Sequence, residues 1–178
     1  MGAAIAGRYA GTHPGRVRHL VLLDAWYADI VYSSEWKHFW ELVAQLNPAD
    51  GFASREDYVK TFLTVFPRSD RDVVEASATT LVCDEADKLH RPRTTDPSNT
   101  WESQPTEDEE NELRYKVACQ TLVAQAEYSE LHLPNDNRRV AAIYPIGEAA
   151  TIKGAGQNLA NENTAFTTNL LASFIGRP

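Results

Sequence analysis

Apolar residues recur along the chain at two spacings, and these predict short strands that alternate with helices. The first eleven residues are mostly small and apolar, which is typical of a closely packed helix, and Pro14 follows because proline cannot continue one. The run at 18–24 is apolar in its interior and has the length of a buried strand. Strand-like patterns return at 117–127 and at 149–152.

The middle of the chain, residues 33–89, has a helical pattern instead. Aromatic and aliphatic residues recur every three or four positions after Ser34, which is a plausible N-cap. Ser54 and Ser69 are each followed three residues later by an aspartate, and this spacing resembles the capping box that starts a helix. We therefore expect three consecutive helices in this part of the chain.

The last part of the chain begins with a polar segment, 90–112, which is rich in Pro, Ser and Thr. Its acidic run at 107–110 indicates a solvated loop or a helix start. Residues 134–143 and 164–175 have the apolar spacing of helices. Strands that alternate with helices predict an α/β fold with a parallel sheet and right-handed crossovers. Because an all-parallel sheet rarely stops at three strands, we expect this sheet to be incomplete.

Composition narrows the class of protein. The 178 residues are 43% hydrophobic and 24% charged, which is ordinary for a soluble globular domain. A net charge of −8 argues against nucleic acid or an anionic membrane as the main partner, and no apolar run approaches the ~20 residues of a membrane span. Cys83 and Cys119 lack metal-ligand spacing and do not make a disulfide framework. We therefore expect a cytoplasmic protein with no metal and no cofactor.

Three segments at the start of the chain follow one another in a recognisable order. Residues 1–4 read M-G-A-A, residues 12–17 read T-H-P-G-R-V, and residues 20–24 read L-V-L-L-D. Together they resemble the α/β-hydrolase fold family, in the branch that carries a lid, from just after the nucleophile elbow G-x-S-x-G onward. The resemblance implies that the sequence begins one residue after the catalytic serine, and that the earlier strands and the first oxyanion donor are absent.

The same resemblance implies a partial α/β-hydrolase fold, with a parallel sheet of about three strands, flanking helices and an inserted helical cap. It divides the chain into a partial core at 1–32, a cap with a polar acidic linker at 33–112, and a C-terminal core at 113–178.

The family's triad needs a serine, a histidine base and an acid that orients the histidine. Residues 152–166 resemble the family's histidine loop, and Gln157 occupies the histidine position, where a carboxamide cannot shuttle a proton. Two acids are candidates. Glu130 follows the penultimate strand and Asp24 follows the earlier one. The alternatives are a plain surface glutamate and a structural aspartate bonded to loop amides.

Other features have simpler interpretations. Ser129 and the pair at 33–34 lie outside an elbow context, so we interpret them as a loop serine and an N-cap. The G-A-G at 154–156 resembles the start of a dinucleotide-binding loop but lacks the third glycine, and the histidine-loop resemblance explains it better.

An aromatic cluster forms either the core of the cap or an apolar pocket for a small substrate. Its members include Trp26, Trp36 and Trp40.

These features together predict an α/β-hydrolase family protein, by resemblance a hydrolase of ester-like bonds in small molecules. We expect it to be catalytically impaired as given, because the serine is missing and Gln157 replaces the histidine. The alternative is a non-catalytic module, derived from the same fold, that binds a small ligand or another protein. The strand at 20–23 is also expected to expose an unpaired edge through which the chain self-associates.

Overall fold

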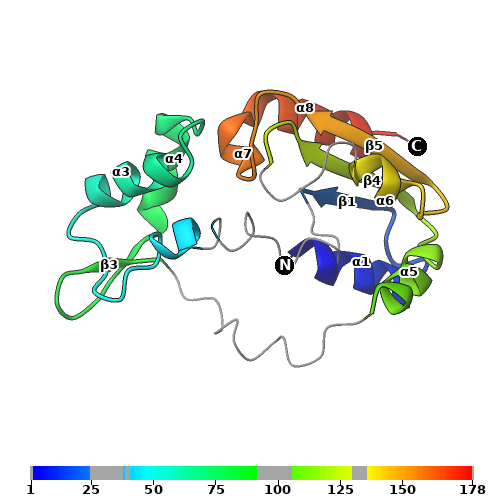
Figure 1. The fold of residues 1–178 in the computed structure, drawn as a ribbon, viewed down its shortest axis with the longest axis horizontal. Helices are drawn as coiled ribbons and strands as arrows, with labels where there is room; N and C mark the ends of the chain where they lie inside the picture. The colour runs from blue at the N-terminus through cyan, green and yellow to red at the C-terminus, as the bar shows by residue number, and fades with distance from the viewer. Residues whose placement is uncertain (1, 25–37, 39–40, 92–105, 130–135, 178) are drawn as a thin grey trace. The chain divides into compact units, whose positions relative to one another are not determined.

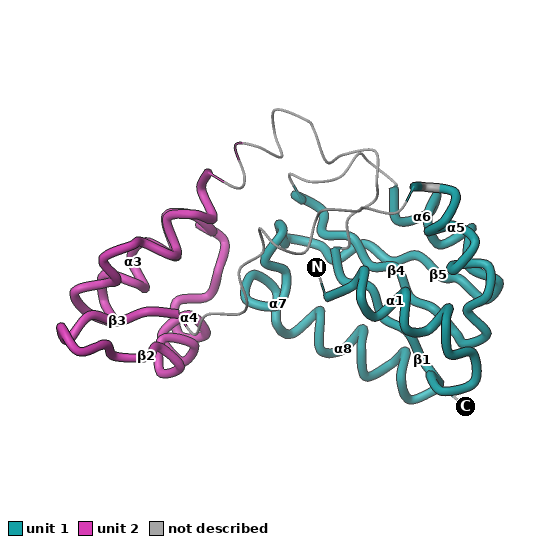
Figure 2. The backbone as a smooth tube through the Cα atoms, turned by 90° about the horizontal axis from the view of Figure 1, so that it is seen from below, with its two compact units in different colours: residues 1–33, 105–178 teal, residues 34–104 magenta. Residues whose placement is uncertain are grey.

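The structure is a computed structural model that describes residues 2–24, 38, 41–91, 106–129 and 136–177. The chain divides into two compact units (Figure 2). Unit 1 comprises Met1–Ser33 and Pro105–Pro178, and unit 2 comprises Ser34–Gln104. No helix in the described ranges combines the length and the apolar character needed to cross a membrane.

Unit 1 is built on a parallel sheet of three strands in the order β1-β4-β5 (Figure 1). The strands are β1 (His19–Leu23), β4 (Gln120–Ala126) and β5 (Gly147–Ile152). In the register, His19 of β1 lies opposite Gln120 of β4. The predicted partial α/β fold with a parallel sheet is therefore confirmed.

Apolar side chains cover both faces of this sheet. Leu20 and Leu22 of β1 are 4% and 3% exposed and pack in a cluster with Ala10 of the first helix. On the opposite face, Leu122 of β4 packs in a second cluster with Phe174 of the last helix. Figure 1 shows these two helices on opposite sides of the sheet. The helices that flank the sheet are α1 (Gly2–Thr12), α6 (Asp136–Ala141), α7 (Leu159–Glu162) and α8 (Thr164–Ile175).

A further helix of unit 1, α5 (Glu107–Tyr115), begins at a capping box formed by Thr106 and Glu109. It packs against α1, where the Arg8 guanidinium lies 2.8 Å from the Glu110 carboxylate. The domain boundary predicted at residue 112 falls inside this helix. The contact with α1 explains why the structure places residues from 105 onward in unit 1.

Unit 2 holds a small helical core of its own. The helix α3 (Arg55–Val65) starts at Ser54, whose hydroxyl accepts a hydrogen bond from the Asp57 N–H at 3.1 Å, as the spacing predicted. Its core is largely aromatic and aliphatic, with side chains 0–9% exposed. The cluster comprises Leu46, Phe52, Tyr58, Val59, Phe62, Val65, Val74, Ala78 and Leu81. Of the first predicted helix, residues 41–44 are helical and most of the rest lies outside the described residues.

Two details of unit 2 differ from the sequence-based expectation. The helix α4 (Arg71–Ser77) is capped by Asp70, whose side chain accepts from the Asp72 N–H, and not by Ser69. A short turn of 3₁₀ helix, Ala78–Thr80, is followed by a hairpin of β2 (Val82–Cys83) and β3 (Leu89–His90) that the helical pattern did not predict.

One side chain, that of Asp84, bonds several groups of the hairpin turn. Asp84 accepts hydrogen bonds from the N–H groups of Ala86 and Lys88, and it lies 2.8 Å from the His90 ring. The Lys88 N–H and the His90 ring hold the pKa of Asp84 below its ordinary value.

Candidate functional site

Three polar side chains meet at the carboxyl edge of the sheet in unit 1. Asp24 follows β1, Ser129 follows the turn after β4, and Gln157 lies in the loop after β5. Parallel strands place their carboxyl ends at one edge, where α/β folds commonly bind ligands. We call these three residues the polar trio.

Asp24 has an unusual backbone conformation that directs its carboxylate over the neighbouring strand. Its φ angle is 44°, in the left-handed region that aspartate tolerates better than most residues. The Asp24 N–H continues the ladder to the Ala124 carbonyl at 2.8 Å, while Oδ1 accepts the Ala126 N–H at 2.9 Å. The residue is 4% exposed. The carboxylate therefore satisfies a backbone donor at the end of β4 and is largely withdrawn from water.

Ser129 joins the other two members of the trio. Its hydroxyl lies 2.6 Å from Oδ2 of Asp24 and 3.3 Å from Oε1 of Gln157. A hydroxyl has a single proton to donate, and the shorter distance favours donation to the charged carboxylate. Both oxygens of the Asp24 carboxylate thus accept hydrogen bonds, and the Ser129 oxygen stands between Asp24 and Gln157.

The loop that carries Gln157 is tied to the end of β4 through Glu127. The Glu127 carboxylate accepts the Gly154 N–H at 2.9 Å and pairs with the Lys153 ammonium at 2.9 Å. The Gly154 N–H, followed by Lys153, lowers the pKa of Glu127 below its ordinary value, and Glu127 raises the pKa of Lys153. Gly154 itself has φ of 71°, which favours glycine at this tight turn.

A second carboxylate, that of Glu162, also accepts a hydrogen bond from the backbone of this loop. Oε2 of Glu162 accepts the Gly156 N–H at 2.7 Å, immediately before Gln157. The side chain of Asn163 donates to the Lys153 carbonyl at 2.7 Å and also caps α8. These bonds tie the backbone just before Gln157 to the side chains of residues 162 and 163 that follow it.

The structure brings together only some of the residues that the sequence singled out. Asp24 and Gln157 lie in the trio. The other candidate acid, Glu130, lies outside the described residues, and so do the aromatic candidates Trp26, Trp36 and Trp40.

Ser129 had been interpreted as an ordinary loop serine, yet it contacts both Asp24 and Gln157. The signal that identifies it is positional. It follows β4, and the two strands that neighbour β4 in the sheet are followed by the other two members of the trio.

The chemistry available to the trio is hydrogen bonding without a proton shuttle. A carboxylate, a hydroxyl and a carboxamide can hold a polar group, but none of the three ordinarily titrates near neutral pH. Activation of a hydroxyl for attack normally needs an imidazole or a comparable base. Within the described residues, no group of three or more His, Cys, Asp or Glu side chains is arranged to hold a metal ion.

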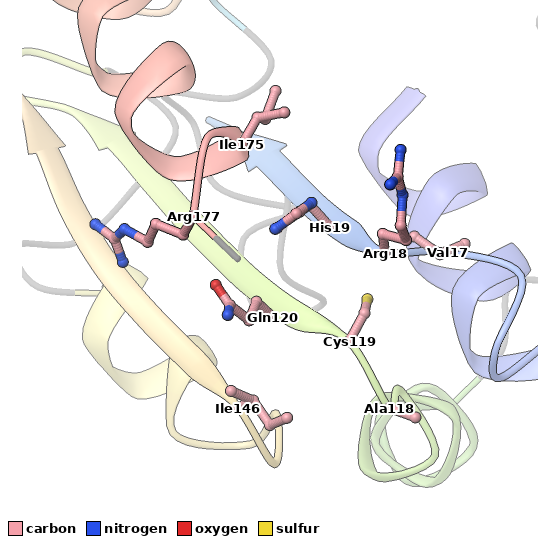
Figure 3. A pocket seen from close by; sticks show the side chains of 9 residues that line it. All are labelled: Val17, Arg18, His19, Ala118, Cys119, Gln120, Ile146, Ile175 and Arg177. Atoms are coloured by element: carbon pink, nitrogen blue, oxygen red, sulfur yellow. The ribbon is translucent and has the colours of Figure 1, made fainter.

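A hollow lies at the opposite, amino edge of the sheet and is separate from the trio (Figure 3). Its volume is about 500 Å³, and its walls include His19, Gln120 and Cys119 from the starts of β1 and β4. Burial raises the pKa of the Cys119 thiol, which therefore stays protonated and poorly nucleophilic at neutral pH. Arg177 at its rim is paired with Glu148 at 2.6 Å. We therefore take the trio, and not this hollow, as the candidate site.

Comparison with known proteins identifies the fold. The sequence matches no protein-family model and no curated protein. Among solved structures, the chain is similar to E-2-(acetamidomethylene)succinate hydrolase, with a TM-score of 0.74 and 16% identity over 99% of this chain and 64% of that one. It is also similar to a thioesterase domain from the curacin biosynthetic pathway, with a TM-score of 0.70 and 13% identity over 95% of this chain and 62% of that one.

An esterase from Mycobacterium tuberculosis is a third similar structure, with a TM-score of 0.70 and 12% identity over 98% of this chain and 60% of that one. The chain thus spans between 60% and 64% of the length of these three neighbours. At such low identities the likeness shows the fold, and that fold is a partial α/β-hydrolase fold, as the sequence resemblance predicted.

Proposed function

We propose that this chain is an α/β-hydrolase family protein whose chemistry is the hydrolysis of ester-like bonds in small molecules, and that the 178-residue form is catalytically impaired. Two of the similar structures are named as a thioesterase domain and an esterase, and a third as a hydrolase. The observation that carries the proposal is the position of Gln157, which contacts a serine that is bonded to a buried aspartate at the carboxyl edge of the sheet.

The geometry of the trio suits the task of orienting a base. In a serine triad, an acid holds one ring nitrogen of an imidazole while the other nitrogen accepts the serine proton. The Ser129 hydroxyl donates to Asp24, and a hydroxyl that donates its proton keeps the chemical capacity to accept an N–H, which a side chain at position 157 could supply. We infer that Asp24 is the acid and acts through Ser129, which makes Ser129 a positioning residue.

Gln157 is the reason to expect impaired catalysis. A carboxamide can donate and accept hydrogen bonds, but it cannot take up a proton at neutral pH. The 178 residues also contain no G-x-S-x-G segment, so the described fold offers no serine in an elbow. Loss of one triad member typically lowers kcat by about 10³-fold or more.

Hydrolysis of p-nitrophenyl acetate and p-nitrophenyl butyrate tests the proposed impairment. We expect neither the chain nor its Gln157→His variant to exceed the buffer blank, because a restored base has no elbow serine to activate. Turnover by the unmodified chain above the buffer blank would contradict the proposed impairment.

The role of the trio can be tested without any activity. The imidazole introduced by Gln157→His should have a pKa above the ordinary value of about 6.5, because the Asp24 carboxylate stabilises its charged form through Ser129. An NMR titration measures this pKa, and the matched double variant Gln157→His with Asp24→Asn should return it toward the ordinary value. Equal pKa values in the two variants would show that Asp24 does not act on position 157.

A further inference from the structure

The hollow at the amino edge of the sheet is formed by described residues of unit 1 (Figure 3). Part of its lining comes from the starts of β1 and β4. Further lining comes from Ile146, which precedes β5, and from Ile175 and Arg177 at the end of α8 and just beyond it. Its volume of about 500 Å³ is within the range of small-molecule sites. The hollow therefore has room for a ligand that contains one aromatic ring.

The charge of this lining differs from the charge of the chain as a whole. The chain has 25 acidic and 17 basic residues, yet the nine residues that line the hollow include two arginines and no aspartate or glutamate. Arg177 pairs with Glu148 at 2.6 Å. Arg18 is exposed and forms no ion pair with any residue that the structure describes. The lining therefore has one uncompensated cation, which attracts an anion.

Phe174, a buried residue of α8, contacts two of the polar side chains in the lining. The His19 ring meets the Phe174 ring edge-on, with the ring centroids 5.6 Å apart. The Arg177 guanidinium lies over the same ring, 5.4 Å from its centroid. Both contacts are favourable and restrict the rotamers of His19 and Arg177. A ligand therefore meets side chains that are already ordered, which lowers the entropy lost on binding.

The polar groups of the lining can bind an oxyanion. His19 and Gln120 lie opposite each other in the register of β1 and β4, and Figure 3 shows their side chains in the middle of the hollow. An imidazole N–H and a carboxamide N–H can each donate a hydrogen bond to an oxyanion. The guanidinium of Arg18 can donate to two oxygens of one carboxylate or phosphate group. These donors come from adjacent positions on two paired strands.

We propose that the hollow binds a small organic oxyanion, with its carboxylate or phosphate group at Arg18 and His19 and an apolar body against Ile146 and Ile175. These isoleucines are 53% and 54% exposed, come from different parts of the chain and both line the hollow. An apolar group placed against them removes apolar surface from water. The site is separate from the trio, so the proposal is independent of the catalytic role inferred for Asp24.

An NMR titration of the ¹⁵N-labelled 178-residue chain with benzoate, in a buffer free of carboxylate and phosphate, tests the site. We expect saturating shifts of the His19 and Gln120 amide signals and a dissociation constant of about 1–10 mM, as suits a ligand with so few atoms. Benzamide has the same shape without the charge, and acetate has the charge without the ring, so each should bind about tenfold more weakly. Phenyl phosphate replaces benzoate in a parallel titration, and the tighter of the two identifies the oxyanion.

Two arginine variants test the position of the anion. Arg18→Gln should weaken binding of the tighter probe about tenfold or more, because it removes the charged donor. Arg16→Gln removes the same charge from an exposed residue outside the lining, and it should change the affinity by less than about twofold. Amide signals of β4 that match those of the unmodified chain confirm that each variant is folded.

Three results would overturn the proposal. The first is that neither benzoate nor phenyl phosphate gives saturating shifts at the hollow by about 50 mM. The second is that benzamide binds as tightly as benzoate and phenyl phosphate, since the site would then not select an anion. The third is that Arg18→Gln and Arg16→Gln weaken binding equally, which would assign the effect to net charge and not to the hollow.

Discussion

At the scale of single residues, two serines illustrate opposite uses of a hydroxyl. Ser129 donates at 2.6 Å to the carboxylate of Asp24, which is 4% exposed. Ser69 is 9% exposed, and its hydroxyl oxygen has no hydrogen-bond partner among the residues that the structure describes. A hydrogen bond to a charged group stabilises a fold more than a neutral one, while a buried hydroxyl without a partner is destabilising. The same substitution should therefore have opposite effects at the two positions.

We predict that Ser129→Ala lowers the free energy of unfolding of unit 1 by about 1.5–3 kcal/mol, since it removes a hydrogen bond to a carboxylate. The matched change Ser69→Ala should leave unit 2 unchanged or stabilise it by up to about 1 kcal/mol, because it removes an unsatisfied group. Urea denaturation followed by signals from each unit measures both. A loss of stability above 1 kcal/mol in Ser69→Ala would show that its hydroxyl has a partner after all.

The sequence predicted some of these residues and not others. Asp24 and Gln157 could be found because each occupies a recognisable place at the end of a strand or in a loop motif. Ser129 could not, because its role depends on a contact across 105 positions of sequence with Asp24. Ser69 was assigned as a helix cap from spacing alone, but the adjacent Asp70 bonds the Asp72 N–H instead. Two neighbouring residues with similar capping ability are not distinguished by spacing.

At the scale of elements, the long periodic segments were predictable and the short ones were not. The helix at 164–175 has the predicted bounds because its apolar residues repeat over three turns. The strands β2 and β3 have two residues each, too few to show a period, and the side chain of Asp84 bonds the turn between them. The loop after β5 is another element held by a carboxylate, in this case Glu127.

This loop should weaken in acid. Folding lowers the pKa of Glu127, chiefly through the Gly154 N–H, so the folded state favours its ionised form. The stabilisation is fully present above the ordinary pKa of 4.5 and is lost as pH falls through the lower folded value. We predict that Glu127→Gln makes the stability of unit 1 less dependent on pH below 4.5. Thermal unfolding across this pH range measures the effect.

The control for this titration is Glu112→Gln, which removes the same charge from an exposed position in α5 that has no ion pair with any described residue. It should leave the pH dependence close to that of the unmodified chain. If both variants reduce the pH dependence of the stability of unit 1 equally, the effect comes from net charge and not from the bond between Glu127 and Gly154.

At the scale of the whole molecule, the chain combines a sheet unit with a separate helical unit. The alternation of strands and helices was sufficient to predict the parallel sheet, because strands separated by helices pair in parallel. The extent of the inserted segment was harder to predict, because α5 begins in an acidic run that resembles a solvated loop. Its contacts with α1, such as the pair of Arg8 and Glu110, place it in unit 1.

Two separate cores should give two separate responses to cavity-forming substitutions. Phe62 is 6% exposed in the core of unit 2, and Leu122 is fully buried in unit 1. We predict that Phe62→Ala destabilises unit 2 by about 3–5 kcal/mol and that Leu122→Ala destabilises unit 1 by about 2–5 kcal/mol. Because the two residues belong to different clusters, each change should act mainly on its own unit.

Native-state hydrogen exchange measures this directly, with amides of α3 reporting on unit 2 and amides of β4 on unit 1. Faster exchange in α3 alone after Phe62→Ala, and in β4 alone after Leu122→Ala, is the expected pattern. If either variant accelerates exchange equally in both helix and strand, the units unfold together and the division of the core into independent clusters is wrong.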